Sequence, residues 1–270
     1  MNQFPEQLPY WRKSKGLSQL ELALEAEVSN KHISFLETGR AKPSREMVLL
    51  LSNILDLPLR NRNDLLQAAG FSEHYSRKPI DKKEMETVFA TLELMLSKHE
   101  PFPAIVLDWD WNILMSNTAF QKLSKWLRSR RPNFSNSSNI VELIFDPYGF
   151  KPFIGNWEKV AHVTIQRLHR ESMTHKNRHK NLLSRLSSYS DIPQSWKKIN
   201  FKQEVAPMIC LELETEDTSL KLITTLSSFG TPIDVTVEEI VVEQYFPADV
   251  QTKHFFENEL LLLDSSKTNF

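Results

Sequence analysis

The chain has 270 residues, of which 40% are hydrophobic and 25% are charged, and its formal net charge is −1. A chain of this size has room for two domains. Because the net charge is close to zero, the composition excludes a protein that binds nucleic acid through its overall charge, and any DNA contact has to come from a local patch. The single cysteine, Cys210, excludes an internal disulfide and a metal site built from several cysteines.

No apolar run approaches the ~18 residues that a membrane-spanning helix needs. The first residues, MNQFPEQLPYWRK, contain no apolar signal core. We therefore expect a cytoplasmic protein with no membrane partner. The sequence also has only 6 glycines, with no glycine-rich phosphate loop and no GxSxG or HExxH motif. We expect no enzyme activity and no catalytic residues.

The N-terminal part is predicted to be entirely helical. Residues 5–14 should form the first helix, with Trp11 as its anchor. Two short helices joined by a tight turn are then predicted within residues 16–40, which read GLSQLELALEAEVSNKHISFLETGR. This helix-turn-helix pattern is the main functional signal in the sequence.

The ends of these two helices are marked by capping residues. Ser18 is a good N-cap for the first helix, and Glu21 lies three residues further on, at the capping-box spacing. Ser29 offers an N-cap for the second helix, and Gly39 supplies its C-terminal stop.

The second of these helices is predicted to have one buried face and one polar face. Ile33 and Leu36 are one turn apart and share the buried stripe, so the opposite face should carry side chains that can enter a major groove of double-stranded DNA. Asn can pair with adenine and Lys with guanine or phosphate, while basic residues at the flanks can hold phosphate. The candidate DNA-contacting residues are Gln19, Ser29, Asn30, Lys31, His32, Ser34, Phe35, Arg40 and Lys42. The alternative is a helical hairpin that packs on something other than DNA.

Two further helices complete a five-helix domain. One should begin at Pro43 and Ser44, with an apolar stripe of Met47, Leu50, Leu51 and Ile54, and the other should cover residues 60–69. Leu20 and Leu24 lie away from the predicted core and should be partly exposed. We hypothesise that they dock on the second domain or on a partner subunit.

Residues 72–83 have scattered charge and no period, and are interpreted as a linker. A helix is predicted at 84–98, followed by a β-hairpin around DWDW and a helix that begins after Asn117. Alternating residues predict three more strands at 208–214, 220–226 and 235–245. Two strands, several helices and three strands is the order of a PAS-like domain, in which helices cover one face of a five-stranded sheet.

The space between such a sheet and its helices can be filled or open to a small molecule. The candidate ligand-contacting residues are bulky apolar side chains: Trp111, Phe120, Trp126, Phe145, Phe153, Trp157, Trp196 and Leu211. The alternative for each of them is an ordinary core position. The basic run at 167–185 is interpreted as a solvated helix and loop, and His99, His162 or His169 would be the residues available if the domain bound haem. No zinc-type motif is present, and we expect no metal.

The sequence also resembles known families. SQLELALEAEVSNKHISFLETGRAKPSREMVLLLSNIL resembles the xenobiotic-response-element (XRE) class of helix-turn-helix domains, and this resemblance implies that Arg12 and Glu37 form a buried structural pair. HEPFPAIVLDWDWNILMSN, FDPYGFKPFIGNW and TTLSSFGTPIDVTVEEIVVEQYFPAD resemble the MmyB-like ligand-binding domain of many bacterial regulators. The second resemblance implies a PAS-like fold, a pocket for a fatty acyl chain or a similar molecule, and dimerisation.

The predicted protein has an all-α, five-helix domain at 1–71, a linker at 72–83, and an α+β PAS-like domain with a five-stranded antiparallel sheet at 84–270. We expect a homodimeric DNA-binding transcriptional regulator whose C-terminal domain binds a hydrophobic small molecule and no other cofactor. One alternative is a C-terminal domain with a filled core that serves only for dimerisation or protein docking. The other is a sensor that carries haem or another cofactor.

Overall fold

The structure is a computed structural model that describes residues 4–77, 83–174, 179–189, 191–193, 196 and 210–260. The chain forms two compact units. Unit 1 comprises Met1–Lys82 together with Gly230–Glu238, and unit 2 comprises Lys83–Phe229 and Glu239–Phe270. Unit 1 therefore includes a short stretch from the far half of the sequence as well as part of the stretch interpreted as a linker.

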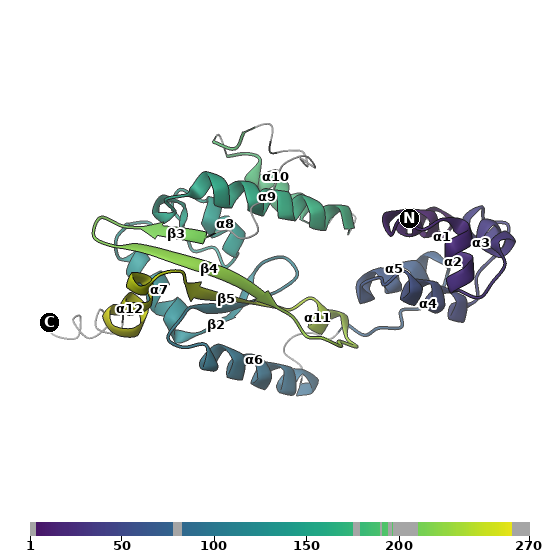
Figure 1. Ribbon diagram of the computed structural model, residues 1–270, viewed down its shortest axis with the longest axis horizontal. Helices are drawn as coiled ribbons and strands as arrows, with labels where there is room; N and C mark the ends of the chain where they lie inside the picture. Colours follow the sequence, from purple (N-terminus) through teal and green to yellow (C-terminus); the bar gives the residue numbers. More distant parts are fainter. Residues whose placement is uncertain are drawn as a thin grey trace. The chain divides into compact units, whose positions relative to one another are not determined.

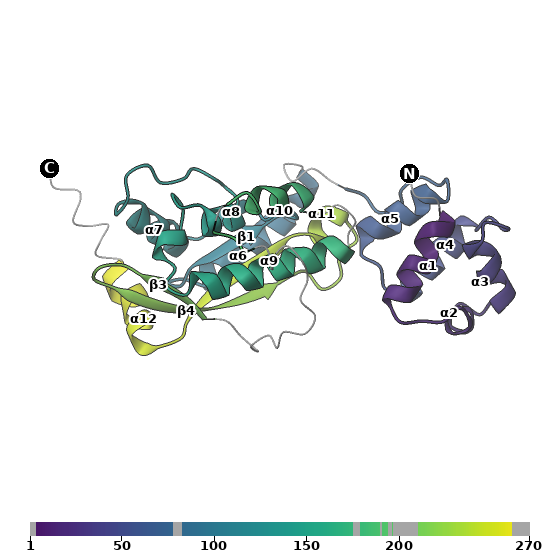
Figure 2. The same ribbon diagram turned by 90° about the horizontal axis from the view of Figure 1, so that it is seen from above.

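Five helices form the larger part of unit 1, as predicted. They are α1 (Phe4–Ser14), α2 (Gln19–Glu25), α3 (Asn30–Glu37), α4 (Arg45–Ile54) and α5 (Leu59–Ala68). Ser18 and Ser29 are the N-caps of α2 and α3, and their side chains accept hydrogen bonds from the backbone N–H groups of Glu21 and His32, both at 3.1 Å. Figure 2 shows α2 and α3 following one another around α1 and α4. The capping residues therefore set the boundaries of the helix-turn-helix.

The core of unit 1 differs from the prediction in α4. Leu22, Ile33 and Leu36 are fully buried, as the helical spacing predicted. In α4, Leu51 is buried as predicted, but Leu50 is 40% exposed and Val48, outside the predicted stripe, is buried. The predicted stripe was wrong at Leu50 because the buried face of α4 is rotated by about one residue from the one that the leucine spacing indicated.

A five-stranded antiparallel sheet forms the centre of unit 2, with the strand order β2-β1-β5-β4-β3. The strands are β1 (Ala104–Leu107), β2 (Ile113–Ser116), β3 (Cys210–Glu214), β4 (Ser219–Ser227) and β5 (Val241–Pro247). Residues 208 and 209 of the predicted third strand lie outside the described residues. The order of two strands, helices and three strands along the chain is confirmed. β5 is the middle strand of the sheet and pairs with both β1 and β4.

The last strand is shorter than predicted. Residues 235–238 form the short helix α11 (Val235–Glu238), and only the later part of the predicted 235–245 strand is extended. The side chain of Asp234 accepts a hydrogen bond from the N–H of Thr236 at 2.8 Å, and its carbonyl accepts one from the N–H of Glu238 at 3.1 Å. The prediction was wrong here because this local capping outweighed the alternating pattern.

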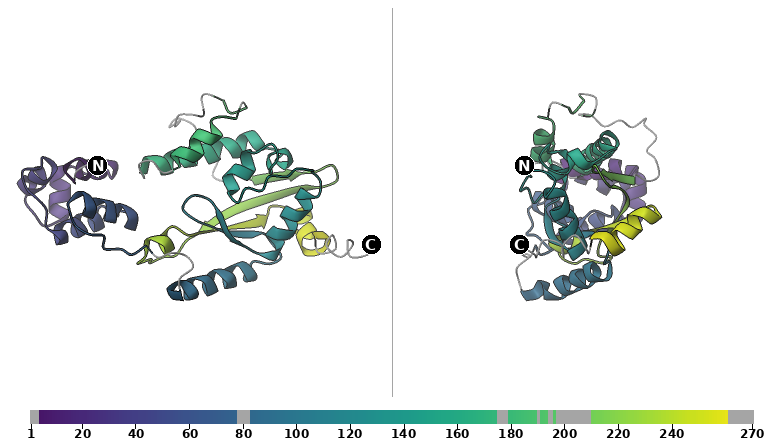
Figure 3. Two further views of the ribbon diagram at one scale, coloured as in Figure 1. Left: turned by 180° about the vertical axis from the view of Figure 1, so that it is seen from behind. Right: turned by 90° about the vertical axis from the view of Figure 1, so that its left-hand side faces the viewer.

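Helices lie on both sides of the sheet. They are η1 (Lys83–Met85), α6 (Glu86–Lys98), α7 (Thr118–Arg128), α8 (Ile140–Phe145), η2 (Lys151–Phe153), α9 (Trp157–Thr174), α10 (Lys180–Leu186), α12 (Val250–His254) and the π-helical turn η4 (Phe255–Glu259). Figures 1 and 3 show α8, α9 and α10 over one face and α6 against the other. Helices thus cover one face, as expected, and α6 also packs against β1 on the other face, where all four residues of β1 are buried.

Candidate functional site

The outward face of α3 is the first part of the candidate site. Ile33 and Leu36 point into the core, whereas Asn30 and Lys31 are exposed and Ser34 is half-buried. The serine N-cap leaves the first turn of the helix facing outward with its own N–H groups partly satisfied. The helix therefore presents the polar face that the sequence predicted.

Phe35 lies between two cations on this surface. The Nζ atom of Lys31 is 5.4 Å from the centre of the Phe35 ring, and the guanidinium carbon of Arg40 is 5.8 Å from it. These are cation–π distances, and both positive charges lie over the same aromatic ring. Lys42, a little further along, is exposed. The end of α3 thus carries a local basic patch despite the nearly neutral chain.

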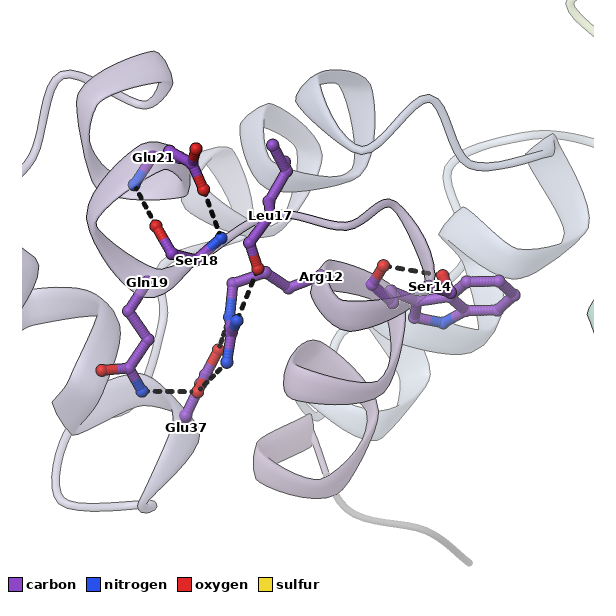
Figure 4. Close-up of polar contacts among 8 residues, drawn as sticks. Arg12, Ser14, Leu17, Ser18, Gln19, Glu21 and Glu37 are labelled. Atoms are coloured by element: carbon purple, nitrogen blue, oxygen red, sulfur yellow. Dashed lines mark hydrogen bonds and ion pairs between the residues drawn. The ribbon is translucent and has the colours of Figure 1, made fainter.

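A buried ion pair ties α1 to the end of α3, as the family resemblance implied (Figure 4). Arg12 Nε and Nη2 donate to Glu37 Oε1 and Oε2 at 2.6 and 3.1 Å, and Arg12 Nη1 donates to the carbonyl of Leu17 at 2.7 Å. The two side chains are only 9% and 7% exposed. The hydrogen bonds to Glu37 raise the pKa of Arg12 further above its usual range. This pair positions α3.

Gln19 takes part in the same network, which the sequence did not indicate. Its Nε2 atom donates to Glu37 Oε2 at 2.6 Å, so its amide joins the start of α2 to the end of α3 (Figure 4). The N–H side of Gln19 is therefore engaged inside the protein. Only a contact between residues 18 positions apart reveals this role, and no short spacing in the sequence encodes it.

A small apolar cavity in unit 2 is the second part of the candidate site. Its volume is about 40 Å³. It is lined by Pro103, Phe120, Leu123, Leu127, Ile140, Ile144, Phe150, Ile154, Leu211, Leu213, Leu222 and Tyr245. Ligand pockets for small molecules have volumes of roughly 300–1,000 Å³. Side chains around this cavity would therefore have to move before it admitted an elongated ligand.

The cavity includes two of the eight predicted ligand-contacting residues. Phe120 and Leu211 line it, while Phe145, Phe153 and Trp126 belong to the surrounding core. The three remaining residues, Trp111, Trp157 and Trp196, make specific contacts elsewhere in unit 2. The structure therefore brings only part of the predicted set to one place.

Trp157 and Trp196 lie further along the helical side of the core. The indole N–H of Trp157 donates to the carbonyl of Ile144 at 2.9 Å, and the Trp157 ring packs edge-on against Phe145. Trp196 stacks on the His162 ring with centroids 5.0 Å apart. These two tryptophans have structural partners on α8 and α9.

Trp111 belongs to a polar cluster with residues of α9. Its indole N–H donates to Glu171 Oε2 at 3.3 Å, and the guanidinium of Arg167 lies 4.3 Å from its ring. Arg167 Nε also donates to Glu171 Oε1 at 2.9 Å, and His179 Nε2 lies 2.8 Å from Glu171 Oε2. Trp111 has a positive φ of 69°, which is rare for an aromatic residue. The basic run at 167–185 thus supplies buried contacts as well as surface charge.

Two polar residues of β5 were missed by the sequence analysis. Tyr245 lines the apolar cavity, and the side chain of Glu243, two residues earlier, hydrogen-bonds with it. Burial raises the pKa of Glu243 to about 7, although the charge of Arg167 and the Tyr245 hydrogen bond act to lower it. Burial also raises the pKa of Tyr245. A glutamate in phase with an inward-facing tyrosine on an alternating strand was the available signal.

The described residues form neither a metal-binding group nor a membrane-spanning helix. In the described ranges, no three His, Cys, Asp or Glu side chains come together as a metal-binding group. Over the same part of the chain, no helix is both long enough and apolar enough to cross a membrane. The buried His99 ring places Nε2 2.9 Å from the carbonyl of Tyr245, so it makes a structural hydrogen bond.

A capped helix-turn-helix and an antiparallel sheet domain with an apolar cavity define a two-part regulator of the DNA-binding type. The family model described as "MmyB-like transcription regulator ligand binding domain" matches residues 88–258, and a helix-turn-helix model matches residues 10–60. The chain belongs to this MmyB-like family, and its first unit is a helix-turn-helix domain of the XRE type.

Other comparisons add little. No curated protein matches the chain. Among solved structures, the chain is similar to one described as "Structure of an RNA-binding Light-Oxygen-Voltage Receptor". The sequence identity is 12%, the TM-score is 0.28, and 97% of this chain is covered. The chain spans 64% of the length of that receptor chain.

Proposed function

We propose that the protein is a cytoplasmic transcription regulator that binds double-stranded DNA with the outward face of α3. The observation that supports this proposal is the surface of the capped helix α3. Asn30 and Lys31 are exposed there, close to Phe35 and the two cations over its ring. Asn30 and Lys31 would contact base edges, Ser34 and Phe35 would contact bases nearby, and Arg40 and Lys42 would hold phosphate. His32 and the N-cap residue Ser29 would lie at the DNA major groove that α3 enters. Gln19, at the start of α2, would approach a DNA phosphate with the amide hydrogen that it does not donate to Glu37.

The protein would bind as a homodimer on an inverted repeat, with half-sites about one helical turn apart. Unit 2 would bind a hydrophobic, fatty acyl-like molecule, which the apolar cavity between β4, β5 and α7 supports. The ligand would change DNA affinity only by binding the competent and incompetent arrangements unequally. The chain would need no other cofactor and would catalyse no reaction.

The small cavity volume favours a second candidate function. A cavity of about 40 Å³ is close to a filled core, and a filled core would make unit 2 a dimerisation or protein-docking module. In that case DNA binding would be constitutive or controlled by a protein partner. The two candidates share the role of α3 and differ only in what unit 2 binds.

The DNA-binding proposal is tested by substitutions on two parts of the patch. A preferred duplex is first selected from a random pool with the unaltered chain. Asn30→Ala or Lys31→Ala should weaken binding to this duplex by about 1–3 kcal/mol per lost base contact and relax the base preference, while Lys42→Ala should weaken all duplexes alike. Titrations on selected and random duplexes measure both effects. Equal losses on both duplexes from the Asn30 and Lys31 variants would contradict base reading by α3.

The ligand proposal is tested by mass spectrometry of the purified full chain. Denaturing extraction should release an acyl compound at close to one per subunit, and native mass should show it bound. A chain that carries no extra mass and does not bind added fatty acids would favour the filled-core candidate. The native mass measures the dimer in the same experiment.

A further inference from the structure

Unit 1 contains a segment that the sequence order assigns to the sheet domain. Gly230–Glu238 connects β4 to β5, yet it belongs to the same compact unit as α1 to α5. We call this stretch the β4–β5 segment. Because the segment lies between two strands of the sheet in the chain, specific contacts with other residues of unit 1 are needed to hold it in that unit.

The first contact is at the beginning of α5. The N-cap of this helix is Pro58, and no side chain of the described residues near it in sequence provides a cap. Instead, the carboxylate Oε2 of Glu238 accepts a hydrogen bond from the N–H of Leu59 at 2.7 Å, across 179 residues of sequence. A carboxylate at a helix N-terminus also interacts favourably with the helix dipole. Glu238 therefore serves as the missing cap of α5.

The second contact joins the segment to residue 76. The N–H of Val235 donates to the carbonyl of Ser76 at 2.9 Å, and Ser76 Oγ donates to Asp234 Oδ2 at 2.6 Å. Asp234 and Val235 are both buried. The pair Ser76 and Asp234 also forms a parallel β-bridge. Backbone and side-chain bonds thus hold the segment in one register.

Residue 76 is itself held close to α5. Asn63 Oδ1 accepts hydrogen bonds from the N–H groups of His74 and Tyr75, both at 3.0 Å, and its Nδ2 donates to the carbonyl of Tyr75 at 2.8 Å. Asn63 is buried on α5, the helix that also carries the core residues Leu65 and Leu66. The contacts of the β4–β5 segment are therefore transmitted to the core of the helix-turn-helix unit.

The β4–β5 segment continues at its two ends into β4 and β5, and both strands line the apolar cavity. Leu222 of β4 and Tyr245 of β5 both face the cavity. We propose that the β4–β5 segment is the coupling element of the regulator: it docks on α5 so that a shift of β4 or β5 on ligand binding changes the DNA-binding unit. Glu238 and Asp234 are its positioning residues. This inference rests on the proposed function, because the segment can only couple DNA binding to unit 2 if unit 1 binds DNA.

Reciprocity gives a test that needs no ligand. If the segment couples the two units, bound DNA must alter β4 and β5 as much as changes in β4 and β5 alter DNA binding. The full chain is compared with Glu238→Ala and with Glu238→Ala combined with Asp234→Ala, which remove the acceptor oxygens, using the selected duplex. Hydrogen exchange of the β4 and β5 amides is measured with and without DNA. Glu216→Ala, on the exposed turn between β3 and β4, is the matched control.

In the unaltered chain and the control, bound DNA should change exchange in β4 and β5 by about fivefold or more. In the Glu238 variants this change should disappear, while the amides of Leu59 and Val235 lose protection. An equal change in the Glu238 variants, or no change in the unaltered chain bound to DNA, would overturn the coupling. Failure to select any duplex would instead overturn the proposed DNA binding, and the inference with it.

A covalent version separates coupling from folding defects. Ser76→Cys with Asp234→Cys, made in a Cys210→Ser chain, places two thiols at the bridged pair, where a disulfide can form. The oxidised form should retain the DNA-dependent change in β4 and β5, and the reduced form should lose most of it. Equal responses in the two forms would contradict the role of the segment.

Discussion

Two glutamates of this protein contrast in how the structure surrounds them. Glu37 in unit 1 receives hydrogen bonds from both nitrogens of the Arg12 fork and from Gln19, so its charge is matched by a cation and by donors. Glu243 in unit 2 is bonded to the neutral phenol of Tyr245, with Arg167 acting only through its charge. Burial consequently raises the pKa of Glu243 to about 7.

The contrast separates a fixed element from an adjustable one. An ion pair with all its donors placed holds α1 and α3 in one arrangement, as a surface that reads DNA requires. A carboxyl with a pKa near neutral can change its protonation with modest changes of environment. The polar group of the cavity region is therefore responsive where that of the DNA-binding unit is rigid.

The largest expected effect comes from breaking the Arg12–Glu37 pair. Glu37→Ala leaves the Arg12 charge buried without its partner and should destabilise unit 1 by about 3–5 kcal/mol. Hydrogen exchange of α3 amides in the full chain measures this unit separately from unit 2. The double substitution Arg12→Met with Glu37→Leu should recover much of the loss, since it removes both charges. A loss below about 1 kcal/mol for Glu37→Ala would place the pair among exposed ion pairs instead.

The second prediction concerns Glu243 and pH. Its pKa in the folded protein, about 7, is above the ordinary value of 4.5, so the folded state holds the proton more tightly than the unfolded state. The stability that this provides is present below pH ~4.5 and is lost as pH rises through ~7. Relative to Glu243→Gln, the unaltered chain should therefore lose stability, on the order of 3 kcal/mol, between pH 4.5 and pH 8.

Urea unfolding followed by tryptophan fluorescence at several pH values measures this difference, because most of the tryptophans lie in unit 2. Glu216→Gln is the control, and its difference from the unaltered chain should not vary with pH. If the difference in the free energy of unfolding between Glu243→Gln and the unaltered chain were also constant across this pH range, Glu243 would be ionised like an exposed carboxylate.

The smallest expected effect is at the N-cap of α2. Ser18 accepts from the N–H of Glu21 at 3.1 Å, and the Glu21 carboxylate accepts from the N–H of Ser18 at 2.6 Å. The hydrogen bond from the Ser18 N–H, and next a hydrogen bond with the Ser18 side chain, lower the pKa of the Glu21 carboxyl. Ser18→Ala should cost unit 1 about 1 kcal/mol. Exchange of α2 amides measures the loss, and Ser44→Ala, at the N-cap of α4, should give a similar value.

Leu20 and Leu24 illustrate what helical spacing can and cannot predict. They are 57% and 69% exposed, as their positions on the helical wheel indicated. Their proposed docking on the second domain or on a partner subunit stays a prediction. Helical spacing predicts which side of a helix faces away from its own core, but it does not identify what covers that side.

The sequence by itself determined the local features. The five N-terminal helices, the caps at Ser18, Ser29 and Asn117, the inward face of α3 and the order of the strands along the chain all follow from residues a few positions apart. Capping and periodicity act within one or two turns of chain, so they can be recognised without the fold.

Only the tertiary structure decided the features that join distant residues. The link from Gln19 to Glu37, the pair of Glu243 and Tyr245 beside the cavity, and the Glu238 cap on α5 depend on how separate elements pack. The helical start of the predicted 235–245 strand has a different cause, because it follows from local capping by Asp234. Burial and pairing of polar groups are set by the whole surrounding structure, and the sequence pattern of one segment does not contain them.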